Sequence, residues 1–225
     1  MSIAENLEKI KQNIALACQR SGRKESDVKI LAVTKTRTPE EINEAVRLGL
    51  TELGENRVQE FISKYPLVSD KAIWHIIGHL QTNKVKYIAD KVSMIHSVDS
   101  EKLAIQIDKE SKKYGKVTDI LIEINSGEEN KNGIEAQKSF ELCEKISDLE
   151  NVRICGLMTM APLSADSITL HRVFSDLRIL SDKIKSENIP NVCMKELSMG
   201  MSGDYIEAIE EGATIIRPGR SLFNV

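Results

Sequence analysis

Short apolar runs alternate with longer amphipathic stretches along most of the chain. Runs rich in Ile, Val and Leu predict eight buried β-strands, at residues 28–34, 52–54, 73–80, 94–98, 119–124, 153–160, 196–199 and 214–217. Between them, apolar positions at helical spacing predict helices, most clearly at 38–49, 100–115, 134–149, 168–188 and 204–211. The stretches that follow Glu55 and Gln81 are weaker helix predictions, because they hold few apolar positions.

Two of the predicted helices begin with strong capping signals. Ser2 and Glu5 have the spacing of a capping box, and the apolar positions behind them predict an N-terminal helix that ends near Gly22. Residues 38–41 combine an N-cap threonine, a proline at the first helical position and a glutamate at the third. They predict a second helix, which Gly49 ends.

The alternation of strands and helices predicts a single (β/α)8 TIM barrel preceded by the N-terminal helix, with residues 1–225 forming one domain. Eight buried strands that alternate with helices favour a parallel sheet with the helices outside it. The length of 225 residues suits one such barrel. A doubly wound open sheet is the alternative; its dinucleotide-binding form is disfavoured because no GxGxxG motif follows the first strand.

Charge and cysteine content exclude several classes of protein. Lys and Arg total 31 against 34 Asp and Glu, a net charge of −3, which argues against nucleic-acid and membrane-surface partners. The chain has no apolar segment of membrane-spanning length and no signal peptide, so we expect a cytoplasmic protein. The four cysteines are scattered without a CxxC motif; we expect reduced thiols and no metal site.

Polar residues gather at the predicted carboxyl ends of the strands, which form the active face of a barrel. Lys35 follows the first strand, Asn56 follows the second, and Arg217 ends the last. The turn at 198–203 leads into a short helix, and Gly219 allows a ligand to approach the backbone closely. Together, these two last turns predict a site for a phosphate group.

Lys35 is the residue with the most distinctive chemistry. It is either a solvated lysine at the end of a strand or an imine-forming amine, activated by partial desolvation and by cations such as Arg217. A lysine that faces an arginine and a phosphate site is the arrangement that a pyridoxal phosphate Schiff base needs.

Histidine and methionine residues offer weaker candidates. His75 and His79 are four residues apart in one predicted strand, so we expect both to point to the same side, as packing or polar lining rather than as zinc ligands. We interpret the four methionines at 158, 160, 199 and 201 as lining of the barrel mouth rather than as a soft-metal site.

Five motifs, spread over the chain, make it closely similar to the pyridoxal phosphate homeostasis proteins, whose fold resembles the N-terminal barrel of alanine racemase. The motifs are AVTK at 32–35, LGENRVQE at 53–60, WHIIGHLQTNK at 74–84, GLMTM at 156–160 and LSMGMS at 197–202. A set of this density is far more specific than a single glycine-rich motif.

The resemblance implies a pyridoxal 5′-phosphate (PLP) cofactor held as a Schiff base on Lys35. Arg217 would then face the pyridine nitrogen, and Asn56 would line the ring. The expected cofactor-binding residues are Lys35, Asn56, Ser198, Met199, Arg217, Gly219 and Arg220. Among them, Ser198 and the Gly219–Arg220 backbone would hold the phosphate. Lys131 matches a second lysine of the family, near the entrance to the site.

One segment departs from the family pattern. The last turn reads RPGRSLF, where many members have RIGTAIFG. Arg220 therefore either adds a side-chain contact to the anion or points outward.

The resemblance implies a protein that buffers and delivers PLP inside the cell, with effects on amino-acid and keto-acid balance and with PLP-dependent apoenzymes as candidate partners. We expect no catalytic turnover, and a monomer or weak homodimer. The alternative is a PLP-dependent racemase or lyase with Lys35 as its base, in which Tyr205 is the tyrosine that could act as a second acid or base. A third hypothesis is a phosphosugar-type barrel enzyme in which Lys35 acts without a cofactor.

Overall fold

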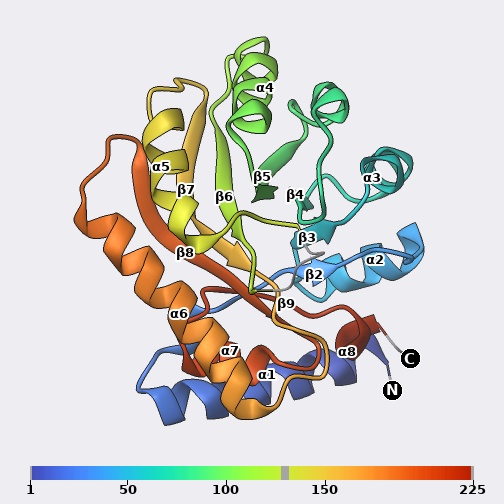
Figure 1. Cartoon of the computed structure of the whole chain (residues 1–225). Coiled ribbons are helices and arrows are strands. Elements are labelled where there is room, and N and C mark those ends of the chain that lie inside the picture. The colour runs from blue at the N-terminus through green and yellow to red at the C-terminus, as the bar shows by residue number, and fades with distance from the viewer. Residues whose placement is uncertain (1, 128–131, 224–225) are drawn as a thin grey trace.

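A computed structural model describes residues 2–127 and 132–223, and it shows a parallel sheet of nine strands (Figure 1). The sheet order is β1-β9-β8-β7-β6-β5-β4-β3-β2. The strands are β1 Lys29–Ile30, β2 Ala32–Val33, β3 Glu52–Glu55, β4 Ile73–Ile76, β5 Val92–Val98, β6 Thr118–Ile124, β7 Val152–Thr159, β8 Val192–Met201 and β9 Ile215–Arg217. Lys131 lies outside the described residues, so its predicted position near the entrance stays a prediction.

The two ends of the sheet meet in one segment, which closes the barrel. Strands β1 and β2 are consecutive and are separated only by Leu31. Ile30 pairs with Ile216 of β9 on one side, and Ala32 pairs with Leu53 of β3 on the other. The predicted strand at 28–34 therefore pairs with both β9 and β3, and the predicted (β/α)8 barrel is confirmed.

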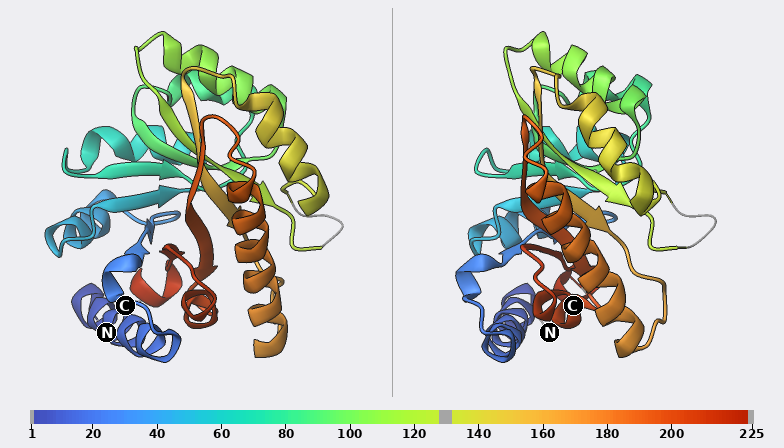
Figure 2. Two further views of the ribbon diagram at one scale, coloured as in Figure 1. Left: turned by 90° about the vertical axis from the view of Figure 1, so that its left-hand side faces the viewer. Right: turned by 60° about the vertical axis from the view of Figure 1, so that its left-hand side comes forward.

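Helices surround the sheet on its outer side, as Figures 1 and 2 show. The α-helices are α1 Ile3–Ser21, α2 Pro39–Arg47, α3 Val58–Lys64, α4 Glu101–Lys112, α5 Ala136–Ile146, α6 Ser167–Ser186, α7 Tyr205–Glu210 and α8 Arg220–Phe223. The 3-10 helices are η1 Glu25–Asp27, η2 Tyr65–Leu67 and η3 Thr82–Tyr87. The weak helix signal after Gln81 thus corresponds to a 3-10 helix.

The capping signals read from the sequence are confirmed. The Ser2 hydroxyl accepts from the Glu5 N–H, and the Glu5 carboxylate accepts from the Ser2 N–H. Thr38 and Glu41 form the same reciprocal pair at the start of α2. At the other end of α1, Gly22 adopts the left-handed conformation (φ 67°) that ends helices.

The apolar side chains form two separate cores, as expected for a barrel whose strands are covered on both faces. A large outer core lies between the strands and the helices and includes the buried face of α1. A small inner core fills the barrel and is made of Leu31, Val33, Ile77, Met94, Leu121, Cys155, Met158 and Ile215. Among the described residues, no helix has the length and apolar character needed to cross a membrane.

The prediction that His75 and His79 point to the same side of one strand is wrong. Strand β4 ends at Ile76, four residues before the predicted end, and the chain leaves the sheet at that point. His75 is buried in the barrel, whereas the side chain of His79 is half exposed, with Nδ1 3.8 Å from Asp99 Oδ2.

Gly156 provides a test of the close approach between β7 and β8. A Cβ atom at this position would overlap the carbonyl oxygen of Glu196 on β8, so the two strands would have to separate. We predict that Gly156→Ala lowers the free energy of unfolding by about 3 kcal/mol or more. Gly203→Ala is the matched control, because nothing lies within 4 Å of its added methyl group. Urea unfolding measures both, and equal stabilities of the two variants would contradict this packing.

Candidate functional site

A cavity of about 680 Å³ opens at the carboxyl ends of the strands. This volume lies within the range of small-molecule binding sites. The structure brings five of the seven predicted cofactor-binding residues to its wall, namely Lys35, Asn56, Arg217, Gly219 and Arg220. They come from the ends of β2, β3 and β9, three neighbouring segments of the barrel, so the predicted residues lie close together, and their role in cofactor binding stays a prediction.

Lys35 stands in a tight turn directly after β2. The Arg37 N–H donates to the Thr34 carbonyl, and Thr36 adopts a left-handed conformation with φ 63°. This conformation is unfavourable for a β-branched residue. Here Glu60 accepts a hydrogen bond from the Thr36 N–H at 3.1 Å. Lys35 itself is exposed and forms no ion pair with a described residue, so its amine is available to a ligand.

A buried ion pair between Lys64 and Glu55 supports the turn that carries Lys35. Lys64 Nζ lies 2.6 Å from Glu55 Oε1 and 2.8 Å from the Thr34 carbonyl oxygen, and Glu55 is fully buried. The Thr34 hydroxyl donates to the same Glu55 oxygen at 2.9 Å. Because each charge has several hydrogen-bond partners, the pair is compatible with burial, and it fixes the backbone that carries Lys35.

Asn56 is positioned by a close crossing of two backbones. An added Cβ atom on Gly78 would lie 2.5 Å from the Asn56 carbonyl oxygen, so only glycine fits at this position. The Asn56 N–H donates to Glu55 Oε2 at 2.9 Å. Asn56 therefore reaches the cavity from a backbone that is held on two sides.

Arg217 is the buried cation of the site, with 4% of its surface exposed. Its Nη1 donates to Ser198 Oγ at 2.7 Å, and its Nη2 donates to the Thr159 carbonyl at 2.8 Å. Burial lowers the pKa of Arg217 to about 10, while Asp204 and Glu123 act in the opposite direction. The guanidinium is thus charged at neutral pH, and it keeps N–H groups for a ligand in the cavity.

The turn after β8 supplies backbone donors to the same cavity. The Asp204 carboxylate accepts from the Met201 N–H, and Ser202 Oγ accepts from the N–H groups of Gly219 (3.0 Å) and Ser221 (3.1 Å). Within the described chain, no acceptor is bonded to the N–H groups of Ser202 and Gly203, and both residues line this cavity as well as a smaller cavity beside α1. Consecutive free N–H groups of this kind bind anions such as phosphate.

The other two predicted cofactor-binding residues do not line the cavity. Ser198 points into the barrel, where its hydroxyl contacts Arg217 and His96. Met199, one residue further along β8, is fully buried in the outer core. Of the other predicted mouth residues, Met160 and Met201 line the cavity.

The sequence predicted a phosphate site in the turn at 198–203 but did not single out Ser202 and Gly203 within it. Gly200 adopts φ 89° in this turn. A Cβ atom on Gly200 would lie 2.6 Å from the Ala208 Cβ, so the turn packs closely on α7. The glycine-rich pattern was the available signal, and it identified the turn but not which residues of the turn face the cavity.

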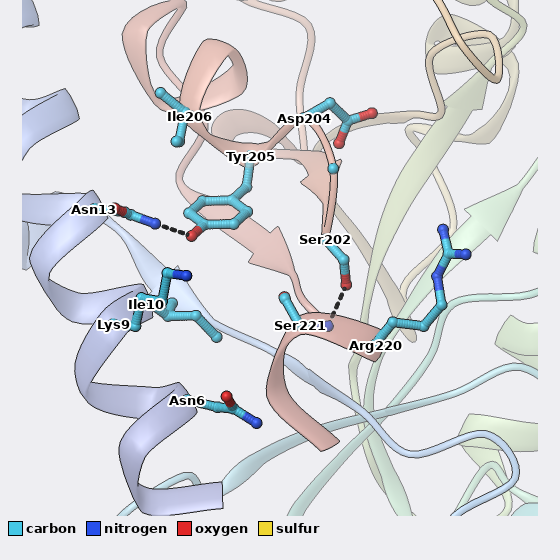
Figure 3. Close-up of a pocket in the computed structure, with 11 residues that line it drawn as sticks. Asn6, Lys9, Ile10, Asn13, Ser202, Asp204, Tyr205, Ile206, Arg220 and Ser221 are labelled. Atoms are coloured by element: carbon cyan, nitrogen blue, oxygen red, sulfur yellow. Dashed lines mark hydrogen bonds between the residues drawn. The ribbon is translucent and has the colours of Figure 1, made fainter. Parts of the chain in front are cut away.

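Tyr205 faces away from this cavity. It lines a second cavity, of about 380 Å³, which lies between α1 and the turn that follows β8 (Figure 3). Its hydroxyl accepts a hydrogen bond from Asn13 Nδ2 of α1 at 2.6 Å. Figure 3 shows the ring directed toward α1, whereas the side chain of Arg220 extends away from α1.

Glu123 is a buried carboxyl near the site. It is 3% exposed, and its Oε2 atom has no hydrogen-bond partner among the described residues. Burial and, to a smaller extent, the charge of Asp99 raise the pKa of Glu123 to about 7, against the opposing effect of Arg217. Neither the strand pattern nor the motifs marked this residue, because its unusual environment depends on which side chains surround it inside the barrel.

Comparison with known proteins agrees with this fold. The family model described as "Alanine racemase, N-terminal domain" matches residues 6–225. An alanine racemase structure from Clostridium difficile has a TM-score of 0.79 at 17% identity, a likeness of fold alone; the match covers 99% of this chain and 56% of that chain.

Closer relatives define the family. The "Pyridoxal phosphate homeostasis protein" of Aquifex aeolicus is 46% identical over 225 residues, which cover 99% of this chain and 98% of that protein. The structure of PipY from Synechococcus elongatus with PLP bound has a TM-score of 0.86 at 33% identity and covers 99% of this chain and 100% of that chain. The chain therefore belongs to the pyridoxal phosphate homeostasis protein family.

The buried carboxyl of Glu123 predicts a pH dependence of stability. Its pKa is higher in the folded protein (about 7) than the ordinary 4.5, so the unfolded chain loses this proton at lower pH than the folded chain does. Stability therefore falls as pH rises from about 4.5 to 7, by on the order of 3 kcal/mol. We predict that Glu123→Gln removes this loss.

Urea unfolding at pH 4.5 and pH 8 tests the prediction. The free energy of unfolding of Glu123→Gln minus that of the parent protein should be more positive at pH 8 than at pH 4.5. The exposed Glu8→Gln is the control, and its difference from the parent should be small at both values. A difference for Glu123→Gln that is the same at both pH values would contradict the buried, high-pKa carboxyl.

Proposed function

We propose that this protein binds PLP in the cavity at the carboxyl ends of the strands and serves in intracellular PLP homeostasis, holding the cofactor and delivering it to PLP-dependent apoenzymes. The observation that carries the proposal is the joint presence of three groups around one cavity. These are the unpaired amine of Lys35, the buried guanidinium of Arg217, and the free N–H groups of Ser202 and Gly203. The names of the relatives and the PLP-bound PipY structure support the same conclusion.

The three groups match the three functional groups of PLP. Lys35 would form a covalent bond with the aldehyde carbon, with loss of water. Arg217 would donate to the pyridine nitrogen, and the cavity wall at Asn56 would contact the ring. The N–H groups of the turn after β8, with Gly219 and Arg220 beside them, would hold the phosphate.

Two of the expected residues have a supporting role in this proposal. Ser198 acts through its hydrogen bond to Arg217, and Met199 anchors the turn by packing in the outer core. Under this assignment, residues 202 and 203, later in the same turn, would make the phosphate contact that was predicted for Ser198.

The same geometry favours binding over catalysis. PLP enzymes use the protonated pyridine ring as an electron sink. Arg217 is positively charged at neutral pH, and beside the ring nitrogen it would disfavour that protonation. The hydroxyl of Tyr205, the tyrosine of the rival racemase hypothesis, is bonded to Asn13 and belongs to the wall of the other cavity.

The first prediction concerns attachment of the cofactor. The purified protein mixed with PLP should gain a visible absorption band, and borohydride should fix the cofactor onto Lys35, as read by peptide mass spectrometry. Lys35→Ala should lose the band and the adduct, because no other described lysine lines the cavity. Lys112→Ala, an exposed lysine on α4, is the control and should behave as the parent. An adduct that persists on another lysine in Lys35→Ala would overturn the assignment.

The second prediction concerns turnover. Incubation of the PLP-loaded protein with L-amino acids should give no sustained formation of D-enantiomers or keto acids, because the ring would be a poor electron sink and the carboxyl that lines the cavity, Asp204, is bonded to the Met201 N–H. Tyr205→Phe should behave as the parent does. Sustained turnover that disappears in Tyr205→Phe would favour the racemase hypothesis instead.

A further inference from the structure

A chain of hydrogen bonds runs through the barrel interior and ends on Arg217. Glu52 Oε2 contacts His75 Nε2 at 2.7 Å, and His75 Nδ1 contacts His96 Nε2 at 2.8 Å. His96 Nδ1 then contacts Ser198 Oγ at 2.8 Å, and Ser198 Oγ accepts from Arg217 Nη1 at 2.7 Å. The five residues come from β3, β4, β5, β8 and β9, so the chain crosses the barrel.

The direction of each hydrogen bond follows from the Arg217 end. Arginine only donates, so Ser198 Oγ is an acceptor toward Arg217 and its own proton is free to donate to His96. His96 is fully buried, and desolvation, together with the positive charge of Arg217, keeps its pKa well below the usual value. His96 is therefore neutral, with a bare Nδ1 that accepts from Ser198 and a proton on Nε2.

The same logic continues to the other end of the chain. The His96 Nε2–H donates to His75 Nδ1, so a neutral His75 carries its proton on Nε2 and donates to Glu52. Glu52 is the acceptor that completes the chain, and its hydrogen bond to His75 lowers the pKa of the Glu52 carboxyl. Each donor in this order meets one acceptor.

The opposite order fits the contacts poorly. If His96 donated from Nδ1, its bare Nε2 would require a proton on His75 Nδ1. A neutral His75 would then turn a bare nitrogen toward the Glu52 carboxylate, and only a charged His75 would donate to both partners. The Ser198 hydroxyl proton would also lack an acceptor among the described residues. Unmade hydrogen bonds of buried groups are costly, so the first order is favoured.

We propose that His96, oriented by His75 and Glu52, is a positioning residue for Arg217 in cofactor binding. His96 accepts a hydrogen bond from the Ser198 hydroxyl, and this orients a lone pair of the Ser198 oxygen toward the guanidinium. The resulting hydrogen bond holds Arg217 in its position at the cavity. The proposal rests on the proposed function for its last step, the contact between Arg217 and the cofactor. The order of donors along the chain does not depend on that step.

Nitrogen-15 NMR of the histidine side chains in the cofactor-free protein tests the order of donors. At pH 8 we expect the proton of both His96 and His75 to lie on Nε2, with a bare Nδ1, as the order of donors requires. His96 should keep this form when the pH is lowered to 6. A proton on His96 Nδ1, or a charged His96 at pH 8, would overturn the proposal whether or not PLP binds.

Paired variants then test the positioning role. His96→Leu removes the acceptor for Ser198, whereas His96→Asn keeps an oxygen near the position of Nδ1. We expect His96→Leu to weaken PLP binding by about tenfold, the effect of one hydrogen bond to a charged group, and to shift the absorption band. His96→Asn should recover most of the affinity and the parent spectrum. His171→Leu, on the outer helix α6, is the control.

A double variant separates positioning from loss of packing. Ser198→Ala should resemble His96→Leu in PLP affinity and spectrum, and the double variant should be no worse than Ser198→Ala alone, because both changes break one chain. Unchanged PLP affinity and spectrum in a folded His96→Leu would overturn the positioning role even if the NMR result agreed. If the parent protein bound no PLP, the proposed function would fail, and the NMR experiment would still decide the order of donors.

Discussion

The pairing of residues 29–33 with two different neighbours sets the geometry on which the site depends. Ile30 pairs with β9 and Ala32 pairs with β3, so this short segment joins the two ends of the sheet. Lys35 leaves the barrel two residues after β2, between the strand that ends in Arg217 and the strand that precedes Asn56. Closure of the barrel thus brings an amine, a guanidinium and an amide, far apart in the sequence, to one cavity.

A buried arginine whose described hydrogen-bond partners are neutral is the second constraint. Burial of a charge is costly, and Arg217 donates to neutral oxygens of Ser198 and Thr159, while Asp204 and Glu123 favour its charge without a described ion pair to it. The nearby Glu123 keeps its proton up to about pH 7, so it compensates the charge only in part. The guanidinium of Arg217 can therefore still attract a ligand that enters the cavity. In the proposed complex, the cation would also disfavour protonation of the pyridine ring, in line with a role in holding PLP.

The sequence was sufficient for those features that depend on local patterns. The strand runs and the caps at Ser2 and Thr38 predicted the barrel, and the strand ends predicted Lys35, Asn56 and Arg217 in one site.

Features that depend on pairing between strands were less accessible from the sequence. Whether Ser198 faces the cavity or the barrel interior depends on its position along β8, where the pairing with β9 is irregular between Ser198 and Met201. His96 escaped notice for the same reason, because its partners come from strands distant in the sequence.

A crystal structure of the protein grown with PLP tests the central claim most directly. The account predicts continuous electron density from Lys35 Nζ to the cofactor, with Arg217 facing the pyridine nitrogen and the phosphate at the N–H groups of Ser202 and Gly203. Density for PLP in another cavity, or in this cavity with the ring nitrogen turned away from Arg217, would contradict it.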